Sequence, residues 1–195
     1  MVKEDVVARL QGGPIRRVKS TLICTSIEAL RAFGHFESYE RLLAPSAAVH
    51  VLGAVAATWL PIEAGVGHYA ACEALGLDRA GIVAVGNASI RRLQQSVFNT
   101  VGLLAQQVGA DPWTILPAYP RLWSRHFDGG GVTVTKVGPT DALCELRDLP
   151  FCRFQYFRTA HAAQVRYSTS RFATAVHVRE HAASSTSLTL AVSWS

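Results

Sequence analysis

Residues 129–150 carry the sequence GGGVTVTKVGPTDALCELRDLP, which is the clearest indication of the fold class. An alternation of apolar and polar side chains begins at Val132 and stops at a Pro-Thr-Asp turn. It then resumes and continues to Leu146. Alternation places successive side chains on opposite faces of a strand, so the stretch predicts a hairpin with one buried face. Before Gly129 the apolar residues recur at helical spacing instead. The character of the chain therefore changes at the three glycines.

The remainder of the chain continues this new pattern. An aromatic stretch with helical spacing follows (Phe151 to Tyr167), and two further alternating runs close the sequence at Thr174–Glu180 and Leu188–Trp194. Strand, strand, helix, strand, strand is the expected order. The sequence thus predicts an α+β fold, in which a helical N-terminal two-thirds packs on a C-terminal four-stranded antiparallel sheet made of two hairpins flanking one helix.

The front of the chain predicts helices. Residues 1–19 are polar and interrupted by Gly12-Gly13-Pro14, so we expect a flexible N-terminal arm, followed by a single domain over residues 20–195. Its clearest helical signal is an apolar stripe over five turns. The stripe consists of Ile90, Leu93, Val97, Val101, Leu104 and Val108.

Bulk composition narrows the function classes. Apolar residues make up 49% of the 195, which favours a large core or an apolar pocket. The net charge of +5 comes from scattered basic residues rather than from a cluster, so nucleic-acid binding is not expected. The apolar run from Leu42 to Leu60 is interrupted by Pro45 and His50, so no membrane span is predicted. Four cysteines without a CxxC pair favour reduced thiols and a cytoplasmic location.

Catalytic and phosphate-binding motifs do not emerge from the sequence. It has no GxSxG, HExxH or GxxxxGK[ST], and Gly65-Val66-Gly67 is only a fragment of a dinucleotide fingerprint. The three glycines at 129–131 precede a strand rather than a helix, so their amides are not expected to cradle phosphate. We therefore expect a protein that is not an enzyme.

Two positions could hold a metal or haem. His68 and Cys72 stand four residues apart on a predicted helix, which places imidazole and thiol on one face, although a buried pair in the core is the alternative. His126 lies beside Trp123 in the last helical turn before the sheet, where it could face a cavity or lie at the surface. Since two ligands do not make a site, we predict no metal site and leave the cofactor open.

The sequence resembles a paralogous family of unknown function known mainly from myxobacteria. The resemblance lies in three stretches and in the closing strand that ends at Trp194. The stretches are VKSTLICTSIEALRAFG (18–34), ATWLPIEAGVGHYAACEALG (57–76) and PRLWSRHFDGGGVTVTKVGPTDALCELRDLP (120–150). That family is similar to a superfamily of haem-nitric-oxide-binding sensors, four-vinyl-reductase-type sensors and transport-protein-particle (TRAPP) subunits. The resemblance implies helices packed on an antiparallel sheet, with an apolar pocket between them.

The residues carried over from these relatives are few. Haem sensors grip the haem propionates with a Tyr-x-Ser-x-Arg motif on the second strand of the first hairpin, and residues 142–148 have no such motif. His126 could stand in for the axial ligand. Zinc-binding relatives use a cysteine at the helix start, which Cys152 matches, and a glutamate that Glu180 matches, but Ala183 and Thr186 stand near the positions of the other two thiols.

From these observations the sequence predicts a cytoplasmic, non-enzymatic sensor or carrier domain in signalling. Its partner is a small apolar molecule bound in a hydrophobic pocket between helices and sheet, and a homodimer is expected. The predicted pocket residues are Trp59, His68, Tyr69, Cys72, Phe98, Trp123, His126, Cys144 and Phe154. The alternatives are a dimerising scaffold without ligand, as the resemblance to transport-particle subunits implies, and a haem-binding sensor.

Overall fold

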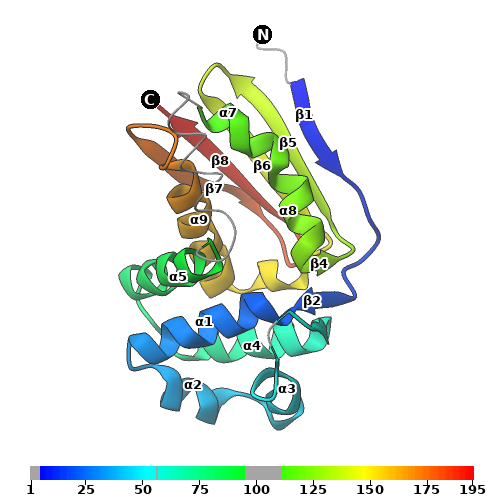
Figure 1. Cartoon of the computed structure of the whole chain (residues 1–195), viewed down its shortest axis with the longest axis vertical. Coiled ribbons are helices and arrows are strands. Elements are labelled where there is room, and N and C mark those ends of the chain that lie inside the picture. Colours follow the sequence, from blue (N-terminus) through cyan, green and yellow to red (C-terminus); the bar gives the residue numbers. More distant parts are fainter. Residues whose placement is uncertain (1–4, 56, 95–110) are drawn as a thin grey trace.

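The computed structural model describes residues 5–55, 57–94 and 111–195 (Figure 1). Its helical front and its C-terminal sheet are joined by the chain around the three glycines. The front contains α1 (Ser20–Ala32), α2 (Phe36–Leu42), α3 (Pro45–Val51), α4 (Ile62–Ala74) and α5 (Arg79–Gln94). Short helices α7 (Pro112–Ile115), η1 (Leu116–Ala118) and α8 (Tyr119–His126) lead into the sheet. The chain is a mixed α+β protein with an antiparallel sheet, as the sequence predicted.

The main sheet in the described part of the chain has five strands in the order β1-β5-β6-β8-β7. They are β1 (Asp5–Leu10), β5 (Gly131–Gly138), β6 (Asp141–Arg147), β7 (Val176–Ala183) and β8 (Leu188–Trp194). The hairpins β5–β6 and β7–β8 lie on either side of α9 (Gln155–Thr169) in the sequence, with η2 (Pro150–Arg153) before the helix. On β6 and β8 buried and half-buried side chains alternate, so one face of the sheet is covered.

Residues 5–19 differ from the expected flexible arm. Strand β1 pairs antiparallel with β5, from Asp5 opposite Lys136 to Leu10 opposite Val132, and so adds a fifth strand. The arm is held where the chain enters the sheet, since the amide of Gly130 donates to the carbonyl of Gly13 over 2.7 Å. A side chain at Gly130 would collide with Ile15, and its φ of +73° favours glycine. Strand β1 was not predicted because its alternation is weak and its pairing partner lies far along the chain.

A second, three-stranded sheet among the described residues links the helical front to the main sheet. Its order is β3-β2-β4, with β2 (Arg17–Lys19) between β3 (Trp59–Pro61) and β4 (Phe127–Asp128). This sheet interrupts the purely helical front that the sequence predicted before the three glycines. Strands of two or three residues are too short to show an alternating pattern, which explains why they were not expected.

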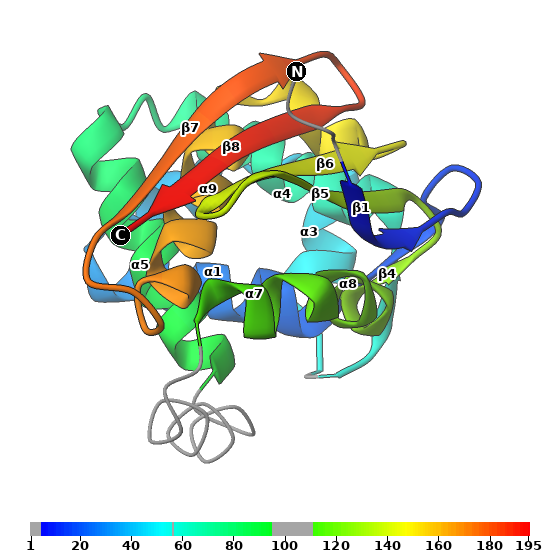
Figure 2. The same ribbon diagram turned by 90° about the horizontal axis from the view of Figure 1, so that it is seen from above.

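Helices α8 and α9 cover the same face of the main sheet (Figure 2). Helix α5 packs against α9, and α1 packs against α5. Helix α8 contacts β5 and β1, whereas α9 contacts β7 and β8 at the other side. The predicted helical stripe begins in the last turns of α5, at Ile90 and Leu93, and its remaining positions lie outside the described residues. Among the described residues, none of the helices has the length and apolar character to cross a membrane.

Candidate functional site

A cavity of about 560 Å³ lies among helices α1, α5, α8 and α9. Helix α9 supplies one continuous stripe of its wall at three- and four-residue spacing, which consists of Tyr156, Phe157, Ala160, His161, Gln164, Val165 and Ser168. None of the described lining residues comes from strands β5 to β8. Helices therefore supply most of the wall, with Phe127 of β4 at one side, and α8 and α9 lie between the cavity and the main sheet. Its volume is typical of ligand pockets, which span about 300–1,000 Å³.

Aromatic rings make up much of the cavity wall. Tyr69 meets Phe157 edge to face at 5.0 Å between ring centroids. Trp123 stacks on Phe127 at 4.1 Å, and the indole nitrogen of Trp123 donates to the carbonyl of Gly129. Tyr69 also meets His68 and Phe151, and Phe127 meets Phe151, so these rings belong to a wider aromatic cluster.

A polar pair interrupts this apolar wall. The hydroxyl of Tyr119, at the start of α8, shares a hydrogen bond with Nε2 of His161 on α9. Both side chains are half-buried, and both line the cavity. Burial lowers the pKa of His161 to about 4, partly offset by a hydrogen bond with Gln164, so the imidazole is neutral at pH 7.

His126 borders the same cavity from the last turn of α8. Its Nδ1 lies 2.8 Å from the carbonyl oxygen of Leu122. Burial lowers the pKa of His126, and nearby Arg125 adds to that effect, whereas the Leu122 hydrogen bond opposes it. A neutral ring with Nδ1–H bound to a carbonyl leaves Nε2 as the nitrogen that a ligand could use.

A second polar cluster lies behind the cavity, where α1, α2 and α4 meet. Nδ1 of His68 lies 2.8 Å from the hydroxyl of Tyr39, and its Nε2 lies 3.1 Å from the hydroxyl of Ser26. Sγ of Cys72 is 3.7 Å from Nε2 of the same ring. Complete burial lowers the pKa of His68 to about 3, so the cluster is neutral. The hydroxyl of Tyr156 is buried beside Ser26 and Cys72 but makes no hydrogen bond of ordinary geometry.

The predicted pocket residues fall in several places. Tyr69, Trp123 and His126 line the cavity. His68 and Cys72 lie in the buried cluster, on one helical face as their spacing predicted. Cys144 is buried on the covered face of β6, Phe154 is half-buried before α9 under the guanidinium of Arg153, and Phe98 lies outside the described residues.

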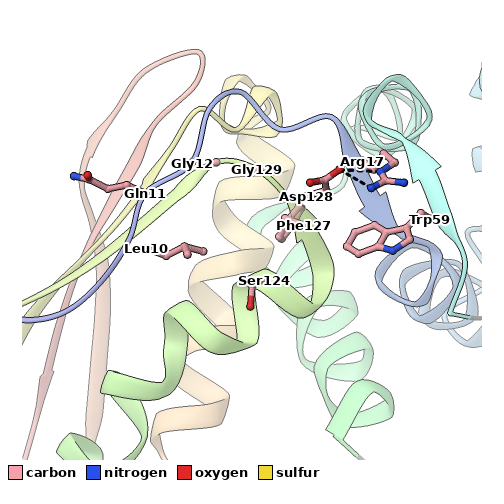
Figure 3. A pocket seen from close by; sticks show the side chains of 10 residues that line it. Leu10, Gln11, Gly12, Arg17, Trp59, Ser124, Phe127, Asp128 and Gly129 are labelled. Carbon is pink, nitrogen blue, oxygen red and sulfur yellow. Dashed lines mark hydrogen bonds and ion pairs between the residues drawn. The ribbon is translucent and has the colours of Figure 1, made fainter.

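Trp59 borders a separate pocket of about 300 Å³ at the three-stranded sheet (Figure 3). There Asp128 accepts from Arg17 at 2.8 Å and from Arg16 at 3.0 Å, and these two bonds lower the pKa of its carboxyl group. Lys19 Nζ lies 4.2 Å from the Trp59 ring centroid. Exposed ion pairs of this kind tie β2 to β4 and leave no enclosed space, so this pocket is the weaker candidate for a ligand site.

Tyr119 and His161 are among the many cavity residues that the sequence did not predict. His161 stands four residues after Phe157, in the aromatic stretch whose spacing predicted a helix. Tyr119 lies between Pro117 and Pro120, which mark an interruption rather than a site. A search for polar side chains in the apolar stripe of the predicted helix would have found His161. Nothing in the sequence indicates that Tyr119 meets it.

The described residues contain no group of three or more His, Cys, Asp or Glu side chains placed to hold a metal ion. Comparison with protein-family models gives no match, and comparison with curated proteins gives none either. Solved structures do match, and all of the following are H-NOX domains. The Fe(II) unliganded H-NOX protein from K. algicida is 8% identical, with a TM-score of 0.62 over 91% of this chain and 96% of that chain.

Two further solved structures are similar to this chain over most of its length. A point mutant of T. tengcongensis H-NOX is 12% identical, with a TM-score of 0.60 over 90% of this chain and 97% of that one. An oxygen-binding H-NOX domain related to soluble guanylate cyclases is 11% identical, with a TM-score of 0.56 over 90% and 94%. The chain has the H-NOX fold. Identities this low show the fold alone, which agrees with the superfamily that the sequence resembles.

Proposed function

We propose that the protein is a non-enzymatic sensor or carrier domain that binds a small, mainly apolar molecule in the cavity among α1, α5, α8 and α9. The observation that supports this most is the cavity itself, with about 560 Å³ bounded by aromatic and aliphatic side chains. A mainly apolar pocket of this size with a few polar groups in its wall is the usual form of a small-molecule site. The cytoplasmic location and signalling role proposed from the sequence are consistent with a sensor.

The test is a variant that fills the cavity. Leu122 is half-buried on α8 and lines the cavity, so Leu122→Trp should occupy ligand space. Arg121→Trp adds the same ring to an exposed neighbour on the same helix. Native mass spectrometry of protein purified from its host should show a co-purified molecule on the wild type and on Arg121→Trp, and much less on Leu122→Trp.

A thermal-shift screen of apolar compounds covers a ligand that is lost on purification. A bound ligand stabilises the fold by about 2.7 kcal/mol at a hundredfold excess over its dissociation constant. The response should disappear in Leu122→Trp and remain in Arg121→Trp. Equal responses from both variants, or no mass and no shift for any compound, would refute ligand binding in this cavity.

A second candidate is a haem-binding sensor, and the position of His126 favours it. Its neutral imidazole borders the cavity with Nδ1 on the carbonyl of Leu122, so Nε2 fits an axial iron ligand. The propionate-binding motif of haem sensors is missing from residues 142–148. Haem would supply an iron that binds a gas, while His126 and the aromatic wall would hold and shield it.

This candidate has a direct optical test. Titration of haem into the protein under reducing conditions should give a sharp Soret band with one equivalent bound, and His126→Gly should lose it. His181→Gly is the matched control, since His181 is exposed on β7. A spectrum that His126→Gly leaves unchanged excludes His126 as the ligand.

The dimerising scaffold is favoured by exposed apolar side chains around α2 and α3. Val49 is 76% and Val55 70% exposed, with Leu42 and Leu52 nearby in sequence. Apolar groups gathered in this way often mark a protein interface. Sedimentation of the wild type and of Val49→Asp would show whether a dimer exists and uses this surface.

A further inference from the structure

The row of rings formed by Phe157, His161 and Tyr119 narrows the class of ligand, on the assumption that the proposed cavity binds one. We propose that the cavity takes an uncharged planar ring compound with a hydroxyl group, and that this hydroxyl meets the Tyr119–His161 pair. Tyr119 and His161 are then specificity-determining residues.

The geometry of the row supports a ring. The rings of Phe157 and His161 lie 5.3 Å apart at an interplanar angle of 15°, and those of His161 and Tyr119 lie 6.2 Å apart at 18°. An aromatic ligand can bind favourably to either the face or the edge of such rings, by offset stacking or by edge-to-face contact. A flexible aliphatic chain gains neither and also loses more rotational freedom on binding.

The hydrogen bonding of the pair supports a hydroxyl. If Tyr119 donates to His161, its oxygen keeps lone pairs that accept a further bond. If His161 donates instead, the phenol O–H of Tyr119 can donate a hydrogen bond to a ligand. A hydroxyl both donates and accepts, so it satisfies either arrangement. A ketone or an ether can satisfy only the second.

The charges around the cavity support an uncharged ligand. The lining includes two arginines, Arg125 and Arg171, and both already have an interaction partner. Asp and Glu do not occur among the described lining residues, so an ammonium group would find no counter-charge there. The polar groups beside the aromatic row, His161, Tyr119 and Gln164, are neutral at pH 7, so a carboxylate beside them would lose hydration and gain no opposite charge in return.

The experiment measures binding of four probes by calorimetry: naphthol, naphthalene, naphthoate and decanol. We expect wild-type protein to bind naphthol most tightly, about threefold to tenfold better than naphthalene, as one neutral hydrogen bond implies. Tyr119→Phe should reduce naphthol to the affinity of naphthalene and leave naphthalene unchanged. Tyr167→Phe is the control, because Tyr167 lies on α9 but is not a lining residue.

Removal of one partner leaves the other unpaired in the protein, and a single variant could lose stability for that reason. The double variant Tyr119→Phe/His161→Phe replaces both partners with apolar rings and should fold. It should bind naphthalene and naphthol equally well. Loss of discrimination in the double variant supports the assignment.

The outcomes separate this inference from the proposed function. If naphthalene binds as tightly as naphthol, or if naphthoate or decanol binds more tightly, the ligand class is wrong while ligand binding in the cavity stands. If Tyr119→Phe and the double variant keep the preference for naphthol, the pair is not the contact. If no probe binds, the ligand class is wrong as well. The co-purified mass on wild-type protein and its loss in Leu122→Trp then decide whether the proposed function survives.

Discussion

The carboxylate of Glu73 on α4 accepts a hydrogen bond of 2.6 Å from the backbone amide of Tyr156 in the first turn of α9. The same carboxylate accepts a second, longer bond from the amide of Gln155 at 3.3 Å. Phe154, at the N-cap position, has no side-chain hydrogen bond to offer. A neighbouring helix thus caps α9, the helix that supplies the polar and aromatic wall of the cavity.

Removal of this cap should weaken the fold. We expect Glu73→Ala to lower the free energy of unfolding by about 1–2 kcal/mol, as other caps do, and Glu73→Gln to lower it less because its amide oxygen still accepts. Urea denaturation measures the difference. Glu40→Ala, an exposed change near the end of α2, is the control and should be nearly neutral. Equal stability of Glu73→Ala and wild type would show that the cap contributes little.

The buried imidazole of His68 should make the protein sensitive to acid. Burial lowers its pKa to about 3, whereas the unfolded chain titrates near 6.5, so the unfolded state binds more protons between these values. The contribution of His68 to stability is therefore complete above pH 6.5 and is lost as pH falls, at up to about 1.4 kcal/mol per pH unit. Denaturation at pH 7 and at pH 5 measures the loss.

His68→Gln separates this effect from that of the partly buried histidines His126 and His161. Gln keeps a donor and an acceptor for Tyr39 and Ser26 but does not titrate. The variant should lose stability at pH 7 and yet show a shallower decline toward pH 5 than wild type. His181→Gln, at an exposed position, should follow the wild-type curve. Parallel curves for wild type and His68→Gln would mean that His68 is not the sensitive group.

The sequence predicted the sheet strands well because their signals are local. Val132, Val134, Cys144 and Leu146 are all buried, as the apolar positions of the alternation required. It placed His68 and Cys72 on one helical face for the same reason. The strand β1 could not be predicted, since its stability comes from pairing with β5, far along the chain.

The cavity was harder to predict than the fold. The prediction placed the pocket between helices and sheet, because the resemblance implied that position. The structure puts α8 and α9 between cavity and sheet, which is why Cys144 does not reach it. The Tyr119–His161 pair joins residues 42 positions apart. Periodicity indicates which face of a helix is buried, but not which helix will face it.

Close contact between α5 and α9 should make Gly86 intolerant of a side chain. A Cβ at Gly86 would lie 2.9 Å from the carbonyl oxygen of Ala160, which is backbone and cannot move away cheaply. Alanine would favour the helix by up to about 1 kcal/mol, but overpacking costs about 1–3 kcal/mol, so we expect Gly86→Ala to be destabilising. At Gly81, near the start of α5, a Cβ would meet only side-chain atoms, those of Asp78 and Leu77. Thermal melts should therefore show a lower melting temperature for Gly86→Ala than for Gly81→Ala.

The four cysteines should differ sharply in reactivity, although all are free thiols. Cys72, Cys144 and Cys152 are buried, and burial raises the pKa of Cys144 and of Cys152 to about 12, so little thiolate forms at neutral pH. Cys24 is half-buried and should react first, although burial raises its pKa too. Maleimide labelling followed by mass spectrometry should add about one label to native protein and four in urea without reductant. Two or fewer labels in urea would reveal a disulfide, and rapid native labelling at Cys72 would show that the buried cluster opens readily.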